Sequence, residues 1–182
     1  MTRAALGRSV DDAEKEAAEE AKAAEEPARG RSRAFWNEKP LEAMSEAEWE
    51  SLCDGCGRCC LQKLEDEDTG RIYHTRVACH LLDPASCRCR DYPSRHARVA
   101  DCLSVRPLTA QKLGWLPSSC AYRRLAEGRG LASWHPLVSG EADSARRAGI
   151  SVADRVVSEH EVPTHELVRY LVTWEGEGEE ER

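Results

Sequence analysis

The octapeptide Cys53-Asp54-Gly55-Cys56-Gly57-Arg58-Cys59-Cys60 places four thiols within eight residues. The chain has nine cysteines, and all of them lie between residues 53 and 120. Thiolates are soft anionic ligands that repel one another unless a cation lies between them. The clustering therefore predicts a metal centre or an iron–sulfur cluster. The candidate ligands are Cys53, Cys56, Cys59, Cys60, Cys79, Cys87, Cys89, Cys102 and Cys120.

The spacing of the first three cysteines is compatible with two kinds of centre. Cys53-x2-Cys56 and Cys56-x2-Cys59 are each spaced to wrap one metal centre, and together they match the opening of a bacterial ferredoxin ligand set. Cys60 then follows at once, whereas the ferredoxin set continues with x3-Cys-Pro. The same residues contain Cys-x2-Cys-Gly, which also suits a zinc knuckle. Spacing alone leaves iron–sulfur and zinc open.

The neighbouring residues Cys59 and Cys60 bear on the number of centres. If this segment is extended, the two side chains point to opposite sides and do not bind the same ion. Setting one of them aside leaves eight thiols, enough for two four-cysteine sites. The alternative is one polynuclear cluster with spare structural thiols. His74 and His80 flank Cys79 and could complete a site, although a lone histidine is more often a surface or core residue.

Arginines also lie close to the cysteines in the sequence. Arg58, Arg76, Arg88 and Arg90 would offset the negative charge of a thiolate-ligated metal, or they are ordinary surface residues. His135, in the segment Trp134-His135-Pro136, is expected to be structural. The sequence contains no phosphate-binding loop and no dinucleotide fingerprint. No acid or base stands out beside the cysteines, so catalysis is disfavoured.

Composition limits the remaining possibilities. The 182 residues have a net charge of −7 and 5% aromatic residues, which predicts a modest apolar core and disfavours nucleic-acid binding. No apolar run approaches the roughly 18–20 residues of a membrane span, and the N-terminus lacks the apolar region of a secretory signal. We therefore expect a cytoplasmic protein without membrane association. In that compartment cysteine clusters usually bind metals, and an odd cysteine count argues against a simple disulfide framework.

The predicted fold class is α+β, a small, mostly helical single domain with irregular cysteine-rich metal-binding loops. Residues 1–33 form an acidic, Ala-rich extension that is expected to be disordered or transiently helical. Residues 34–174 are expected to form the cysteine-cluster domain, and residues 175–182 a disordered acidic tail.

Several elements are predicted within this domain. The capping-box pattern Ser45-Glu46-Ala47-Glu48 predicts a short helix that buries Trp49 and Leu52 and ends at Cys53. A helix over 119–127, capped by Ser118 or Ser119, would place Cys120 in its first turn, where the helix dipole favours a thiolate. The other expected elements are strands over 70–79 and 150–157, a loop over 83–95, a helical turn over 108–113 and a helix over 164–174.

These residues also resemble a known family. The resemblance rests on Phe35-Trp36, on 44–60, and on further segments that include Cys87-Arg88-Cys89-Arg90-Asp91-Tyr92, Trp115-Leu116-Pro117 and Trp134-His135-Pro136-Leu137. It extends over roughly residues 35–162. The chain resembles the YcgN family of bacterial cysteine-cluster proteins, within the wider CxxCxxCC group of zinc- or iron-chelating domains. The resemblance implies metal ligation by the cysteines and a bacterial cytosolic setting, but no established activity.

Three functions are compatible with these observations. The first is an iron–sulfur protein for electron transfer or for redox or iron sensing, favoured by the ferredoxin-like spacing. The second is a zinc protein whose metal stabilises a small module that binds an unknown protein partner. The third is a metal-dependent enzyme with an open coordination position.

Overall fold

The computed structural model describes residues 34–176, so the expectations for residues 1–33 and 177–182 lie outside the described residues. The chain divides into two compact units, one ending at Glu38 and the other beginning at Lys39. In the first unit, the described residues form the one-turn helix α2 (Phe35–Glu38). The rings of Phe35 and Trp36 contact each other edge-on, with 5.1 Å between their centroids.

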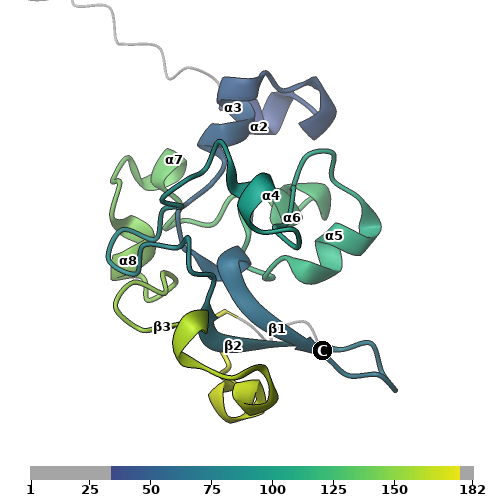
Figure 1. The fold of residues 1–182 in the computed structure, drawn as a ribbon. Coiled ribbons are helices and arrows are strands. Elements are labelled where there is room, and N and C mark those ends of the chain that lie inside the picture. The colour runs from purple at the N-terminus through teal and green to yellow at the C-terminus, as the bar shows by residue number, and fades with distance from the viewer. Residues whose placement is uncertain (1–33, 177–182) are drawn as a thin grey trace, which may run out of the picture. The chain divides into compact units, whose positions relative to one another are not determined.

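The second unit combines short helices with one small sheet (Figure 1). Its α-helices are α3 (Glu46–Ser51), α4 (Arg95–Arg98), α5 (Ala110–Trp115), α6 (Ala121–Ala126), α7 (Pro136–Ser139) and α8 (Ser144–Arg147). Its 3-10 helices are η1 (Leu41–Ala43), η2 (Arg58–Cys60), η3 (Glu159–Glu161) and η4 (Thr164–Tyr170). Turns and loops connect these short elements throughout.

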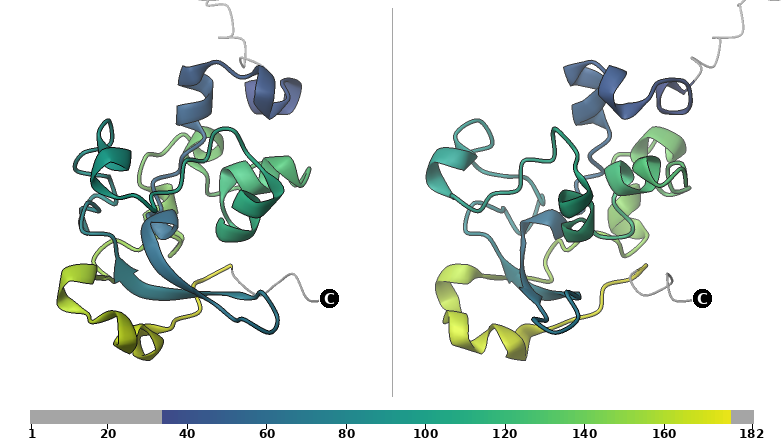
Figure 2. Two further views of the ribbon diagram at one scale, coloured as in Figure 1. Left: turned by 45° about the vertical axis from the view of Figure 1, so that its right-hand side comes forward. Right: turned by 90° about the vertical axis from the view of Figure 1, so that its right-hand side faces the viewer.

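The sheet has three strands in the order β1-β2-β3. Strand β1 (Leu61–Glu65) pairs antiparallel with β2 (Ile72–Ala78), and β2 pairs in parallel with β3 (Val157–Ser158). The 3-10 helix η4 packs against β2, and both views in Figure 2 show it, in yellow-green, beside that strand. This mixture of helices with a three-stranded sheet makes the fold α+β, as the sequence predicts.

The predicted helix before the cysteine loop is present. Ser45 accepts a hydrogen bond from the backbone of Glu48, and Glu48 accepts one from the backbone of Ser45, so the capping box is complete. Helix α3 buries Trp49, and Leu52 at its C-terminal end is fully buried. The loop that contains Cys53 therefore begins from a residue fixed in the core.

Two predictions for the C-terminal part are confirmed only in part. Residues 150–156 form no strand, because their backbone bonds to other loops: Val152 donates to Cys56 and Asp154 to Pro84, each at 2.9 Å. The predicted helix over 164–174 is the shorter 3-10 helix η4. It ends because Leu171 bridges to Thr75 and Val172 donates to the His74 carbonyl oxygen, which extends the chain alongside β2.

Helices α5 and α6 differ from the predictions at their ends. Helix α5 is capped by Thr109 and continues through Gly114 to Trp115, two residues beyond the helical turn predicted over 108–113. Helix α6 has Cys120 as its N-cap instead of a serine. Ser118 is used elsewhere, because its hydroxyl donates to the Gly176 carbonyl oxygen at 2.6 Å. The loop predicted over 83–95 is confirmed as far as residue 94, since α4 begins at Arg95, and the strand predicted over 70–79 is confirmed as β2.

The sheet and the C-terminal segment pack around two small apolar clusters. The larger cluster contains Leu61, Ala78, Leu82, Cys87, Val152 and Trp174. The smaller one contains Val77, Val162 and Leu167. None of the helices formed by residues 34–176 is long and apolar enough to cross a membrane.

Candidate metal centre

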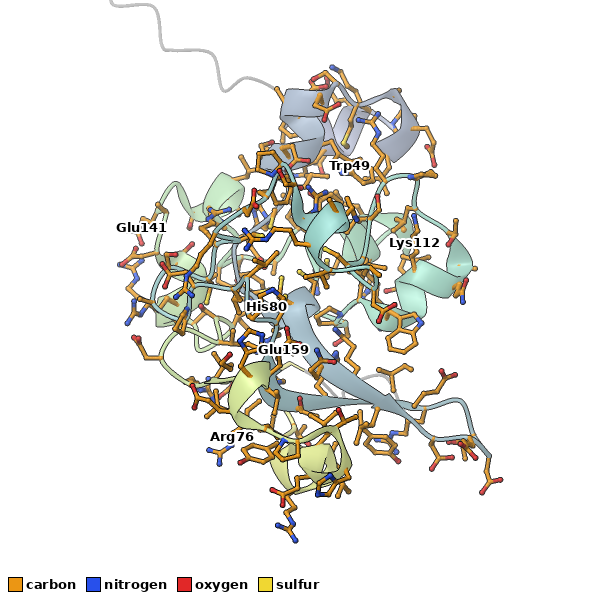
Figure 3. All side chains as sticks on the ribbon, in the orientation of Figure 1. Trp49, Arg76, His80, Lys112, Glu141 and Glu159 are labelled. Carbon is orange, nitrogen blue, oxygen red and sulfur yellow. The ribbon has the colours of Figure 1, made fainter. Side chains whose placement is uncertain are left out.

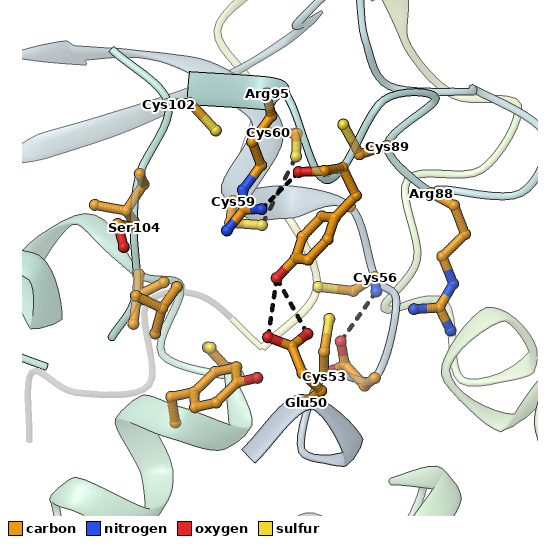
Figure 4. A pocket seen from close by; sticks show the side chains of 18 of the residues that line it. Glu50, Cys53, Cys56, Cys59, Cys60, Arg88, Cys89, Arg95, Cys102 and Ser104 are labelled. Carbon is orange, nitrogen blue, oxygen red and sulfur yellow. Dashed lines mark hydrogen bonds between the residues drawn. The ribbon is translucent and has the colours of Figure 1, made fainter. Parts of the chain in front are cut away.

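Most of the cysteines meet at one cavity of about 480 Å³ (Figure 4). They come from the loop after α3, from η2, from the end of β2, from the 83–94 loop, from the segment after α4 and from the N-cap of α6. The eight cysteines that line the cavity are Cys53, Cys56, Cys59, Cys60, Cys79, Cys89, Cys102 and Cys120. Folding therefore brings together thiols that lie up to 67 residues apart (120 − 53).

Cys87 is the one predicted ligand that does not line this cavity. It is buried in the larger apolar cluster, and its sulfur lies 3.3 Å from the Ser151 hydroxyl oxygen. Burial raises the pKa of the Cys87 thiol, so the neutral form is favoured. Gly57 has a φ of 78°, and a Cβ there would approach the Cys87 sulfur to 3.2 Å. Cys87 thus packs beneath the cysteine loop as a small apolar residue.

The assumption that Cys59 and Cys60 lie in an extended segment is wrong. Both belong to the 3-10 turn η2, which begins after the left-handed Gly57, and their sulfurs lie 3.9 Å apart. At a Zn–S distance of about 2.3 Å, two sulfurs on one tetrahedral ion lie about 3.8 Å apart. The two neighbouring thiolates can therefore share one centre. The hydrogen bond between these thiols lowers the pKa of Cys59 and raises that of Cys60.

The cavity thiols form two groups that meet at this pair. The first group is Cys53, Cys56, Cys59 and Cys120, and the second is Cys60, Cys79, Cys89 and Cys102. Besides desolvation, negative charge on Asp54 and on Cys59 raises the pKa values of Cys53, Cys56 and Cys120. The pKa of Cys60 is raised first by its hydrogen bond with Cys59 and by desolvation. Negative charge on Cys79 and Cys102 raises it further.

Figure 4 shows the same division, with Cys53 and Cys56 toward the lower part of the view and Cys60, Cys89 and Cys102 toward the upper part. Cys79, Cys89 and Cys102 line the same cavity, and negative charge on Cys89 adds, after desolvation, to the causes that raise the pKa values of Cys79 and Cys102.

Desolvation is the main cause of the raised pKa values of Cys53, Cys56 and Cys120. It raises the pKa of Cys53 to about 12, although part of that residue is exposed, and it raises the pKa of Cys56 well above the usual range. Burial also raises the pKa of Cys120, and it outweighs the backbone N–H groups of Arg123 and Tyr122 at the start of α6, which favour the thiolate. Clustered thiols of this kind ionise only with a compensating cation, which fits a thiolate-bound metal.

The arginines divide between the cavity wall and other positions. Arg88 lines the cavity and lies against Gly55. Arg95 and Arg106 also line it, although the sequence analysis did not predict them as neighbours of the cysteines. Arg58 is fully buried in the core. Arg76 lies over the Tyr170 ring, with 5.3 Å between its guanidinium carbon and the ring centroid. Three guanidinium groups therefore offset negative charge on this wall.

The predicted structural role of His135 agrees with its surroundings. It is 1% exposed, its Nε2 lies 3.0 Å from the Leu52 carbonyl oxygen, and its Nδ1 accepts a hydrogen bond from the Leu137 backbone. Neither His74 nor His80 lines the cysteine cavity.

Comparison with known proteins agrees with these observations. Residues 52–121 match the CxxCxxCC family model, described as "Putative zinc- or iron-chelating domain". These residues include all of the cavity cysteines, and the description agrees with the expected cofactors, zinc or an iron–sulfur cluster. No solved structure matches the chain significantly.

Relatives from several bacteria match most of the chain. A UPF0260 protein of Rhodopseudomonas palustris (strain TIE-1) is 56% identical over 141 residues, which are 77% of this chain and 83% of the relative. A UPF0260 protein of Parvibaculum lavamentivorans is 53% identical over 140 residues, 77% of this chain and 92% of the relative. At this identity and coverage, the chain belongs to the UPF0260 family and contains a CxxCxxCC domain.

Proposed function

We propose that this chain is a bacterial cytoplasmic protein of the YcgN type whose cysteine cavity binds an iron–sulfur cluster. The observation that supports the proposal is the meeting of eight thiols on one cavity of about 480 Å³. A single zinc ion takes four ligands and brings its sulfurs to about 3.8 Å from one another. A cluster also contains several iron and sulfide ions, so it needs more room and more widely spaced thiolates.

The first group of thiols is the proposed ligand set: Cys53, Cys56, Cys59 and Cys120. Three of them form the Cys-x2-Cys-x2-Cys run, and Cys120 completes four ligands at the N-cap of α6. When bound, the cluster would supply one-electron redox chemistry. Apolar wall residues such as Leu103 and Leu116 would limit its exposure to water, and nearby Arg88 would offset its charge. Both effects tune a reduction potential, which suits electron transfer or redox or iron sensing.

A zinc-stabilised module that binds a protein partner is the second candidate. It is favoured by the 3.9 Å between the Cys59 and Cys60 sulfurs, which matches two corners of a zinc–thiolate tetrahedron. In that case the metal would contribute folding energy and perform no redox reaction.

The test is metal analysis of protein purified without oxygen. Iron with an equal amount of acid-labile sulfide, and a visible absorption that bleaches on reduction, is the expected result. Cys56→Ser should abolish the colour because it removes a buried ligand. Stoichiometric zinc without iron, sulfide or visible absorption would overturn the proposal and favour the structural module.

A further inference from the structure

A second set of potential ligands lies beside the sheet. Strands β2 and β3 run in parallel, with Ala78 paired to Ser158. The residues that follow these two partners therefore leave the same end of the sheet side by side. They are Cys79 and His80 after β2, and Glu159 at the start of η3. Figure 3 shows His80 and Glu159 next to each other, although 79 residues separate them in the sequence.

The three side chains offer one sulfur, one nitrogen and one oxygen donor. A sulfur of Cys79, a ring nitrogen of His80 and a carboxylate oxygen of Glu159 lie within 4.8 Å of one another. All three residues are partly buried. Zinc takes sulfur, nitrogen and oxygen ligands in this combination, whereas calcium and magnesium prefer oxygen alone. The donor set therefore favours a zinc-type divalent cation.

Neighbouring groups hold these side chains in position. His80 Nδ1 lies 2.5 Å from Glu159 Oε1, which also accepts a 2.9 Å hydrogen bond from the His80 backbone. Gln62 donates to the other carboxylate oxygen, and the His160 ring stacks on His80 with 4.8 Å between centroids. A zinc-type cation held by both groups at about 2.0 Å from each would keep the ring nitrogen and the carboxylate oxygen about 3.3 Å apart. Binding would therefore replace the hydrogen bond between His80 and Glu159 and move these two side chains slightly apart.

We propose that Cys79, His80 and Glu159 bind one zinc-type divalent cation at a second site, outside the ligand set of the iron–sulfur cluster. The three residues supply three ligands, and the fourth position is left for water or another donor. The site does not depend on the proposed cluster, because that cluster takes its ligands from the first group of thiols.

The test is a titration of the full chain with Co²⁺ alone, after anaerobic purification and treatment with a mild chelator. The variants are His80→Asn and Glu159→Gln. Their matched controls are His165→Asn, a histidine with an 82% exposed side chain, and Glu161→Gln, on the same 3-10 helix as Glu159. We expect the wild type and the controls to bind one more equivalent of Co²⁺ than either variant, or to bind it roughly 100-fold more tightly.

Equal stoichiometry and affinity in His80→Asn and His165→Asn would overturn the proposal. Melting curves recorded in chelator show whether Glu159→Gln folds. If it does not, His80→Asn alone decides the outcome. Iron and sulfide are measured in the same samples. If the wild type has neither, the proposed cluster fails, but the comparison of His80→Asn with its control still decides the second site, because both retain every thiol.

Discussion

Arg58 Nε donates a 2.8 Å hydrogen bond to the carbonyl oxygen of Ile150, 92 residues further along the chain. The same guanidinium donates to the Glu175 carbonyl oxygen at 2.7 Å and lies over the Trp174 ring. Arg58 is fully buried, although it lies between the second and third cysteines of the loop. It thus ties the cysteine loop to the C-terminal segment.

Replacing this arginine should destabilise the protein. Arg58→Met leaves the carbonyl oxygens of Ile150 and Glu175 without their donor, and an unsatisfied buried acceptor costs about 1–3 kcal/mol. We expect the free energy of unfolding, measured by urea denaturation, to fall by about 3 kcal/mol. Arg169→Met, whose side chain is 72% exposed, is the control and should change it by less than about 0.5 kcal/mol. Equal midpoints for the two variants would contradict the assigned role of Arg58.

Cys56 and Cys87 are equally buried, so substituting each of them tests which cysteine binds the metal. Their exposed fractions are 7% and 6%, but only Cys56 lines the cavity. Cys56→Ala should lose bound metal and lower the melting temperature, because binding energy at such a site is folding energy. Cys87→Ala should retain the metal and cost about 1–2 kcal/mol of packing. Metal content and melting temperature check both, and loss of metal from Cys87→Ala alone would reverse the assignment.

The capping box of α3 should make stability depend on pH. The hydrogen bond from Lys39, followed by the bond from the Ser45 backbone, lowers the pKa of Glu48 from 4.5 to about 2. A carboxyl whose pKa is lowered on folding stabilises the protein above its unfolded pKa, and this stabilisation is lost as the pH falls through the folded value. Wild type should exceed Glu48→Gln in stability near neutral pH, and the difference should shrink between pH 4.5 and about 2.

Urea denaturation of both proteins over this range measures that difference. Lys39→Met is the companion variant, because it removes the largest cause of the shift and should move the transition toward higher pH. A difference between wild type and Glu48→Gln that stays constant from neutral to acidic pH would contradict the role of the Glu48 charge.

Local signals predicted the elements that depend on neighbouring residues. The capping box predicted α3 because its hydrogen bonds close within four residues, and the alternation near Ile72 predicted β2. The strand predicted over 150–157 is present only at Val157, and the helix predicted over 164–174 stops at Tyr170. The reason is that residues such as Val152 and Val172 bond to distant partners, Cys56 and His74. The intrinsic preference of a residue type for helix or strand gives no information about such distant partners.

The sequence by itself determined that the chain is rich in metal-ligating thiols, since residue type and spacing are properties of the chain. Only the tertiary structure separated the buried Cys87 from the eight cavity thiols, and only it brought Glu159 to His80. It also showed Arg58 as a core residue. The physical reason is that ligation and burial depend on which segments meet in space, and that is decided by packing and long-range hydrogen bonds.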